Sequence, residues 1–71
     1  MKNPTSITDK ETSIMLLVMQ GFTNEKISQK TGISVNTVKY HLKRIYKKLH
    51  VQNRVEAINK FNSINLKIHQ Q

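Results

Sequence analysis

The sequence has no cysteine and no tryptophan, and it holds one proline and two glycines in 71 residues. Without cysteine the chain can form neither a disulfide nor a thiolate metal site, so the stability of so short a chain has to come from packing. The scarcity of proline and glycine is untypical of a linker or a disordered segment. These absences favour a compact helical domain.

Long apolar runs are missing as well. The longest, Ile14 to Met19, is far shorter than the roughly 18 to 20 residues that a membrane span requires. The N-terminus has no apolar segment behind its first charge, so nothing marks the chain for export. We therefore expect a soluble, cytoplasmic protein that does not bind a membrane.

Acidic residues are also scarce: four Asp and Glu stand against twelve Lys and Arg, which gives a formal net charge of +8. An imbalance of this size predicts a polyanionic partner, and the length excludes a multidomain enzyme. The three histidines are scattered and have no cysteine or close acid beside them. We therefore expect no metal site, no catalytic residue and no cofactor.

Capping residues and glycines divide the chain into helices. The first should open at Thr8, whose hydroxyl and the carboxylate of Glu11 have the spacing of a capping box, and cover about 9–20. Gly21 then supplies the left-handed conformation that commonly ends a helix.

The second and third predicted helices lie on either side of Gly32. The second starts behind Thr23 and runs to about residue 30, and the third starts behind the cap Ser34 and covers about 35–49. The turn between them has the length that joins two helices at a steep angle. The third helix carries one core-facing stripe, which consists of Val38, Leu42, Ile45 and Leu49.

A fourth helix is predicted behind the cap Asn53, with Glu56 three residues on, and should end near Ser63 or Ile64. Residues 1–6 and 66–71 are expected to form flexible tails around one domain at 7–65. The predicted fold is therefore all-α, with four helices.

The positive charge is concentrated on the third predicted helix. There is no acidic residue between Ile33 and Gln52, whereas five cations fall on this helix: Lys39, Lys43, Arg44, Lys47 and Lys48. Counted at about 100° per residue, they occupy the side opposite the core stripe. Solvated faces normally interleave both signs of charge, so this pattern favours phosphate binding over a merely soluble surface.

Three segments of the chain carry a recognisable pattern: Gly21 to Ser28, Ile33 to His41, and Ile45 to Val51 followed by Arg54 and Ala57. Together they resemble the LuxR-type helix-turn-helix, the DNA-binding domain of many bacterial transcription regulators. The resemblance covers Ile7 to about Ile64. Ser13 and Thr31 depart from the family pattern, which commonly has Glu and Leu at these positions.

The resemblance implies that the second and third helices bind double-stranded DNA, without a cofactor, and that the fourth helix pairs with its twin in a homodimer. The base-reaching candidates are Lys39, Tyr40 and Lys43. The phosphate-contact candidates are Thr23, Ser34, Asn36, Thr37, Arg44 and Lys47. The candidates for the dimer interface, which share one face of the fourth helix, are Val55, Asn59 and Asn62. The chain resembles the single-domain members of the family or an excised domain.

Other functions remain as alternatives. The chief one is an adaptor that binds another regulator or RNA polymerase with only incidental contact to DNA. A cationic membrane binder is less well supported, because the third helix lacks a broad apolar face with Trp or Phe anchors.

Several side chains have two alternative roles. Glu11 and Arg54 either form an ion pair between the first and fourth helices or act separately. In the second case Glu11 is a helix cap and Arg54 contacts the core or DNA. Tyr46 either closes the core or turns its hydroxyl toward DNA. His41, at the edge of the core stripe, is expected to be packed or adjacent to phosphate.

Overall fold

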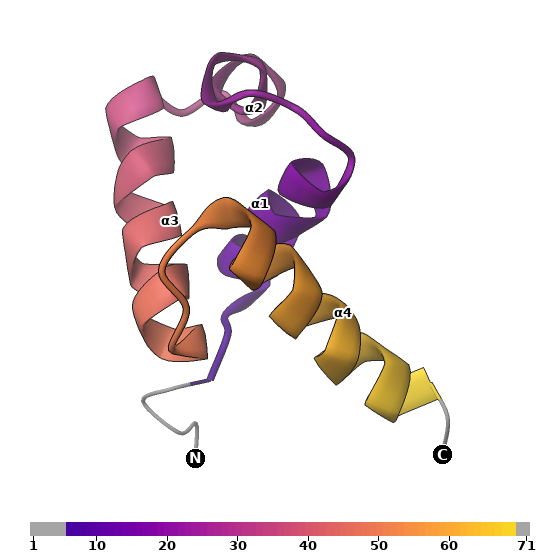
Figure 1. The fold of residues 1–71 in the computed structure, drawn as a ribbon. Helices are drawn as coiled ribbons and strands as arrows, with labels where there is room; N and C mark the ends of the chain where they lie inside the picture. The colour runs from indigo at the N-terminus through magenta and orange to yellow at the C-terminus, as the bar shows by residue number, and fades with distance from the viewer. Residues whose placement is uncertain (1–5, 70–71) are drawn as a thin grey trace.

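Four α-helices make up the computed structural model, which describes residues 6–69 and the side chains of residues 6–64. They are α1 (Asp9–Met19), α2 (Asn24–Thr31), α3 (Val35–Leu49) and α4 (Arg54–His69). In Figure 1, α3 stands along one side, α2 lies near its upper end, and α4 crosses in front of α1. Helices α1 and α3 each pack against the other three. Within the described residues the fold is all-α, as predicted.

The first three helices begin at the predicted caps. The hydroxyl oxygen of each cap, at Thr8, Thr23 and Ser34, accepts a hydrogen bond from the backbone N–H three residues on, at 3.1 to 3.2 Å. At the start of α1 the capping box is complete, because the backbone N–H of Thr8 donates to Oε1 of Glu11 at 2.9 Å. These bonds satisfy backbone donors that have no partner inside the helix.

Hydrophobic side chains from all four helices meet in one core. The buried members are Ile14, Met15, Val18, Ile27, Val38, Leu42, Ile45, Leu49, Ala57 and Phe61. The predicted stripe of α3 is buried along its whole length, which fixes the opposite side of that helix as the exposed one. Tyr46 is half-buried and packs against the core, in agreement with the first of its two predicted roles.

Helix α4 begins as predicted but is longer. The backbone N–H of Glu56 donates to Oδ1 of Asn53 at 2.9 Å, so Asn53 is the cap, while Oε1 of Glu56 accepts from the N–H of Gln52 at 2.8 Å. The predicted end near Ser63 or Ile64 is wrong, because α4 continues to His69 and takes in residues 66–69 of the predicted tail. No glycine or proline follows Ser63 to stop a helix.

The rest of the predicted tails, residues 1–5 and 70–71, lies outside the described residues. None of the helices in the described part of the chain is long and apolar enough to cross a bilayer.

Residues with positive φ end or directly follow three helices, and the first is Gly21 after α1, with φ of 90°, as predicted. Gly32 ends α2 with φ of 76°, and His50 ends α3 with φ of 58°. Glycine adopts this conformation without steric cost, whereas a residue with a Cβ loses about 1 kcal/mol or more. A Cβ added at Gly32 would meet nothing within 4 Å, so only the backbone would resist a substitution there.

We therefore expect opposite effects from two substitutions at these ends. His50→Gly should raise the free energy of unfolding by about 0.5 to 1 kcal/mol, and Gly32→Ala should lower it by about 1 kcal/mol. Urea unfolding followed by circular dichroism measures both changes. A loss of stability in His50→Gly would contradict the backbone argument and would show that the imidazole makes stabilising contacts of its own.

Candidate nucleic-acid interface

The exposed side of α3 presents the predicted nucleic-acid contacts in one strip. Six side chains at helical spacing are exposed there: Asn36, Lys39, Tyr40, Lys43, Arg44 and Lys47. The structure thus brings together all three base-contact candidates and three of the six phosphate-contact candidates. The other side of the same helix is locked into the core, so the direction of the strip is fixed by packing.

The N-terminal end of α3 adds two hydroxyl groups to this strip. Oγ of Ser34 and Oγ1 of Thr37 are 2.9 Å apart and share a hydrogen bond, while Ser34 also accepts from the N–H of Thr37. The hydroxyl of Thr23 caps α2 on an exposed residue. The N-termini of α2 and α3, which are the positive ends of the two helix dipoles, therefore lie among the phosphate-contact candidates.

Tyr40 and Arg44 form a pair in the middle of the strip. The guanidinium carbon of Arg44 lies 5.7 Å from the centre of the Tyr40 ring, and its Nη1 is 3.5 Å from the Tyr40 hydroxyl. The ring of His41 meets that of Tyr40 edge-on at 5.7 Å. Tyr40 is 57% exposed, so the pair is accessible to a ligand, whereas His41 is half-buried.

Lys48, the fifth cation counted on the exposed side, does not lie there. Its side chain is 12% exposed, and its Nζ donates to Oε1 and Oε2 of Glu11 at 2.8 and 3.1 Å and to the backbone oxygen of Ser6 at 3.1 Å. The prediction that all five cations lie opposite the core stripe is therefore wrong for Lys48. At about 100° per residue Lys48 is only about 80° from the centre of that stripe, and a flexible lysine there reaches the nearest buried acid. The cationic strip therefore has four members rather than five.

Glu11 combines a capping role with an ion pair that was not predicted. Its side chain is 3% exposed. Burial by itself raises the pKa of Glu11, but hydrogen bonds from Lys48 and Thr8 and the charge of Lys48 outweigh burial and hold the pKa below its ordinary value of 4.5. The group is therefore ionised at neutral pH.

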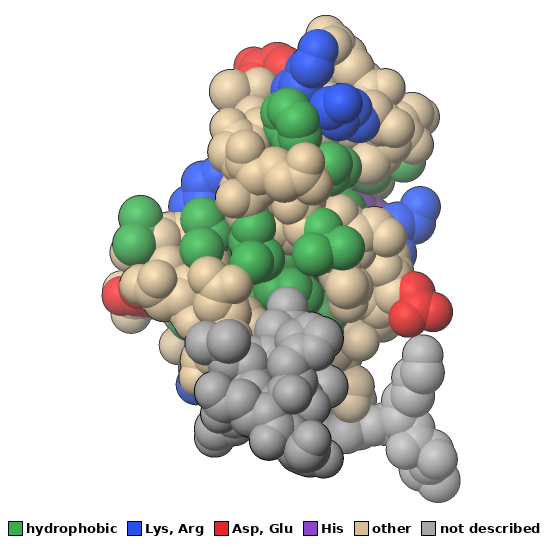
Figure 2. All heavy atoms as spheres, turned by 90° about the vertical axis from the view of Figure 1, so that its right-hand side faces the viewer, with side chains coloured by type: hydrophobic (Ala, Val, Ile, Leu, Met, Phe, Trp, Pro, Cys, Tyr) green, Lys and Arg blue, Asp and Glu red, His purple; other side chains and the backbone are tan. Residues whose placement is uncertain are grey.

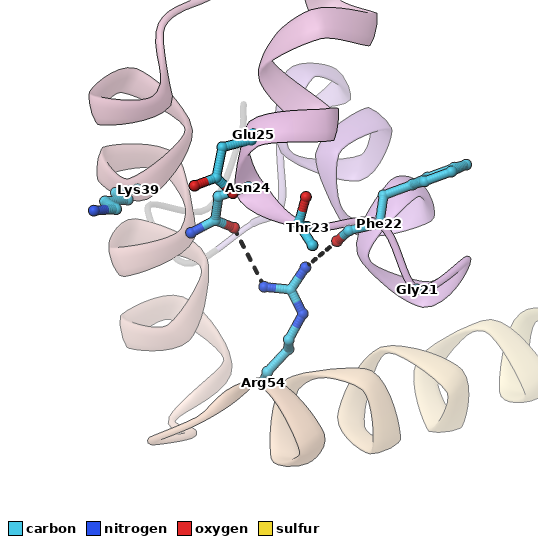
Figure 3. A pocket seen from close by; sticks show the side chains of 7 residues that line it. All are labelled: Gly21, Phe22, Thr23, Asn24, Glu25, Lys39 and Arg54. Atoms are coloured by element: carbon cyan, nitrogen blue, oxygen red, sulfur yellow. Dashed lines mark hydrogen bonds between the residues drawn. The ribbon is translucent and has the colours of Figure 1, made fainter.

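The predicted alternative of an ion pair between Glu11 and Arg54 is wrong. The guanidinium of Arg54 donates to the backbone oxygen of Phe22 and, at 3.3 Å, to Oδ1 of Asn24. Figure 3 shows it reaching from the start of α4 to the segment between α1 and α2, while Lys39 extends from α3 away from it. Arg54 thus ties α4 to the start of α2 and is not part of the exposed strip.

Hollows beside the strip are shallow. One of about 310 Å³ lies between the start of α2, Lys39 and Arg54, and a second of about 260 Å³ lies between Lys43, Tyr46 and Arg54. Among the described residues no group of three His, Asp or Glu side chains is placed to hold a metal ion. The exposed strip suits an extended ligand better than a small enclosed one.

A different surface carries the dimer candidates. Val55, Asn59 and Asn62 are all exposed on α4, and Val55 is 67% exposed. Leu16, on the adjacent helix α1, is also exposed. Figure 2 shows hydrophobic side chains gathered in a band across the face that includes α4.

Comparison with known proteins places this fold in a family. Residues 5–61 match the family described as bacterial regulatory proteins, luxR family. The chain is 47% identical over 64 residues to the probable transcriptional regulatory protein SgaR of Hyphomicrobium methylovorum, a match that covers 90% of the chain and 30% of SgaR. It is 38% identical over 52 residues to the response regulator VraR of Staphylococcus aureus, covering 73% of the chain and 25% of VraR.

A solved structure agrees with these matches. The crystal structure of the response regulator ChrA from a heme-sensing two-component system superposes with a TM-score of 0.85 at 37% identity, over 92% of this chain and 32% of ChrA. The chain thus spans about a third or less of the length of these three relatives. It belongs to the luxR family of bacterial regulatory proteins, a family of DNA-binding transcription regulators rather than enzymes, and its four helices form the helix-turn-helix domain of that family.

Proposed function

We propose that the protein binds specific sequences of double-stranded DNA and thereby regulates transcription. The single observation that carries the proposal is the exposed strip of α3, which has cations along its length and no acid. An α-helix fits the major groove of B-DNA, and in a helix-turn-helix the start of the second helix meets the base edges. Helix α3 takes this position, with α2 crossing the backbone.

The residues of the strip divide by chemistry. Lys39 and Lys43 are suited to the O6 and N7 acceptors of guanine, and the ring of Tyr40 to a thymine methyl group. The groups proposed to hold phosphates are Thr23, Ser34, Asn36, Thr37, Arg44 and Lys47. Hydroxyls, cations and helix N-termini are the usual phosphate contacts, and they fix the position of a protein on the duplex without reading its sequence.

Selection of bound sequences from randomised duplexes tests the proposal. We expect one enriched motif with two inverted half-sites about one helical turn apart, because a two-fold dimer presents two copies of α3 on one face of DNA. Failure to enrich any motif, together with tight binding to another regulator or to RNA polymerase, would favour the adaptor function instead.

The homodimer is proposed to form through α4. Its support is Val55, a hydrophobic residue of α4 that is 67% exposed, with the exposed Asn59 and Asn62 on the same side of the helix. A small apolar centre with a polar rim is typical of interfaces between folded proteins. The proposed location is the cytoplasm, where bacterial DNA is found.

Val55→Lys should disrupt this dimer. Burying an unpaired ammonium is unfavourable, so we expect the affinity for a two-half-site duplex to fall about tenfold or more, toward that for one half-site. The added positive charge would by itself strengthen binding to DNA, so a loss of affinity cannot be attributed to the change in charge. Ser63→Lys, about 80° round the helix from Val55, is the matched control. Equal binding by Val55→Lys and the wild type, with the same stoichiometry in sedimentation, would contradict this interface.

A further inference from the structure

A buried carboxylate lies directly behind the cationic strip of α3. Two cations of that helix stand beside Glu11: Nζ of Lys48 is 2.8 and 3.1 Å from its two oxygens, and Nε of Arg44 is 3.8 Å from Oε2. The carboxylate therefore has two candidate partners on the helix proposed to bind DNA.

The two cations use this carboxylate unequally. Lys48 has three ammonium hydrogens and three acceptors within 3.1 Å, namely the two oxygens of Glu11 and the backbone oxygen of Ser6. Arg44 is too far away to hydrogen-bond to Glu11, and its side chain is 51% exposed. Its other neighbour is the Tyr40 ring on the exposed strip. Lys48 thus occupies the carboxylate, and Arg44 faces solvent.

Competition between the carboxylate and DNA follows from the chemistry of Arg44. A guanidinium binds a carboxylate or a phosphate in the same way, through two parallel hydrogen bonds in a bidentate arrangement. A carboxylate away from water attracts a cation more strongly than an exposed one. If Glu11 lost its ammonium partner, the nearest guanidinium would have to move less than 1 Å to hydrogen-bond to it.

We propose that Lys48 is a positioning residue for DNA binding: by occupying Glu11, it keeps Arg44 available to a DNA phosphate. This inference rests on the proposed function, but it does not require Lys48 to contact DNA. It therefore distinguishes Lys48 from its neighbour Lys47, which is exposed and proposed to contact phosphate.

Lys48→Met tests the inference, because methionine retains an unbranched apolar chain while removing the charge. With Arg44 drawn to Glu11, one phosphate contact is lost. For a duplex that carries one half-site, the plot of log affinity against log salt should become less steep by about 0.9, and the affinity should fall about fivefold at 0.15 M salt. Lys60→Met, which removes an exposed charge on α4, is the matched control and should leave the slope close to that of the wild type.

Two further variants separate positioning from direct contact or simple destabilisation. Combining Lys48→Met with Arg44→Ala should give the slope of Arg44→Ala alone, because both remove the same contact. The double variant Glu11→Gln, Lys48→Met should recover the wild-type slope, since no carboxylate then holds Arg44. Replacing both partners of a buried pair is often nearly neutral for stability, so this variant remains informative even if Lys48→Met does not fold.

Different outcomes would overturn the proposed function and the inference about Lys48. A wild-type protein without specific DNA binding would overturn the proposed function itself. With wild-type binding intact, an unchanged slope in a folded Lys48→Met protein would overturn the inference. A slope that stays reduced in the Glu11→Gln, Lys48→Met variant would also overturn the inference, because Lys48 itself would then contact phosphate.

Discussion

Lys43→Ala should lower the affinity for a duplex that carries one half-site by about five- to 150-fold, the range that corresponds to the loss of one good base contact of about 1 to 3 kcal/mol. Lys43 is exposed near the centre of the strip on α3, between Tyr40 and Lys47. Because Lys43 is proposed to contact a base, its loss should also relax the preference at one position of each half-site. Competition between the selected duplex and single-base variants measures both effects.

Two controls make this result specific to base contact. Lys60→Ala removes the same charge from an exposed site on α4 and should weaken all duplexes slightly and equally. Lys47→Ala, which removes a proposed phosphate contact, should weaken binding uniformly across sequences and reduce the salt slope by about one per half-site. If Lys43→Ala behaves like Lys47→Ala, Lys43 contacts the backbone and the assignment of base contact is wrong.

Glu11→Gln should cost about 3 kcal/mol of the free energy of unfolding at neutral pH. The substitution leaves Lys48 largely buried without its counter-charge, and breaking a buried ion pair in this way is strongly unfavourable. The cost is a large fraction of the roughly 5 kcal/mol expected for a domain of this size. Urea unfolding measures it. Glu25→Gln, at an exposed residue of α2, should change stability by about 0.5 kcal/mol or less.

The same residue gives the stability a defined dependence on pH. Because folding lowers the pKa of Glu11 below 4.5, its contribution is complete at pH values above 4.5 and is lost as the pH falls through the lower, folded-state pKa. The difference in stability between the wild type and Glu11→Gln should therefore shrink in acid. A difference that stays constant from neutral pH to well below 4.5 would contradict the role of the ionised carboxylate.

Local patterns in the sequence predicted most of the fold. The caps Thr8, Thr23 and Ser34 fixed the starts of three helices because each acts on a backbone N–H three residues away. The core stripe of α3 followed from helical spacing alone. The end of α4 was wrong by about five residues, because no glycine or proline marks it and the hydrophobic spacing there is weak.

The partners of the charged residues could not be predicted in the same way. Lys48 bonds to an acid 37 residues earlier in the chain, and Arg54 to a carbonyl 32 residues earlier. Such pairs depend on how the helices pack against one another, and the spacing of residues along one helix does not predict this packing. The sequence analysis grouped Lys48 with the cations opposite the core stripe. Its angle of about 80° from the centre of that stripe, smaller than the angles of Lys43 and Lys47, was the one available signal that it differs from them.

The most direct test of the central claim is a titration of the wild-type protein with the selected duplex and with a scrambled duplex of equal length and composition, repeated over a series of salt concentrations. We expect the selected duplex to bind about a thousandfold or more tightly than the scrambled one at physiological salt. Both affinities should fall linearly on a log–log plot as salt is raised. Equal affinities for the two duplexes at physiological salt would contradict sequence-specific DNA binding by this protein.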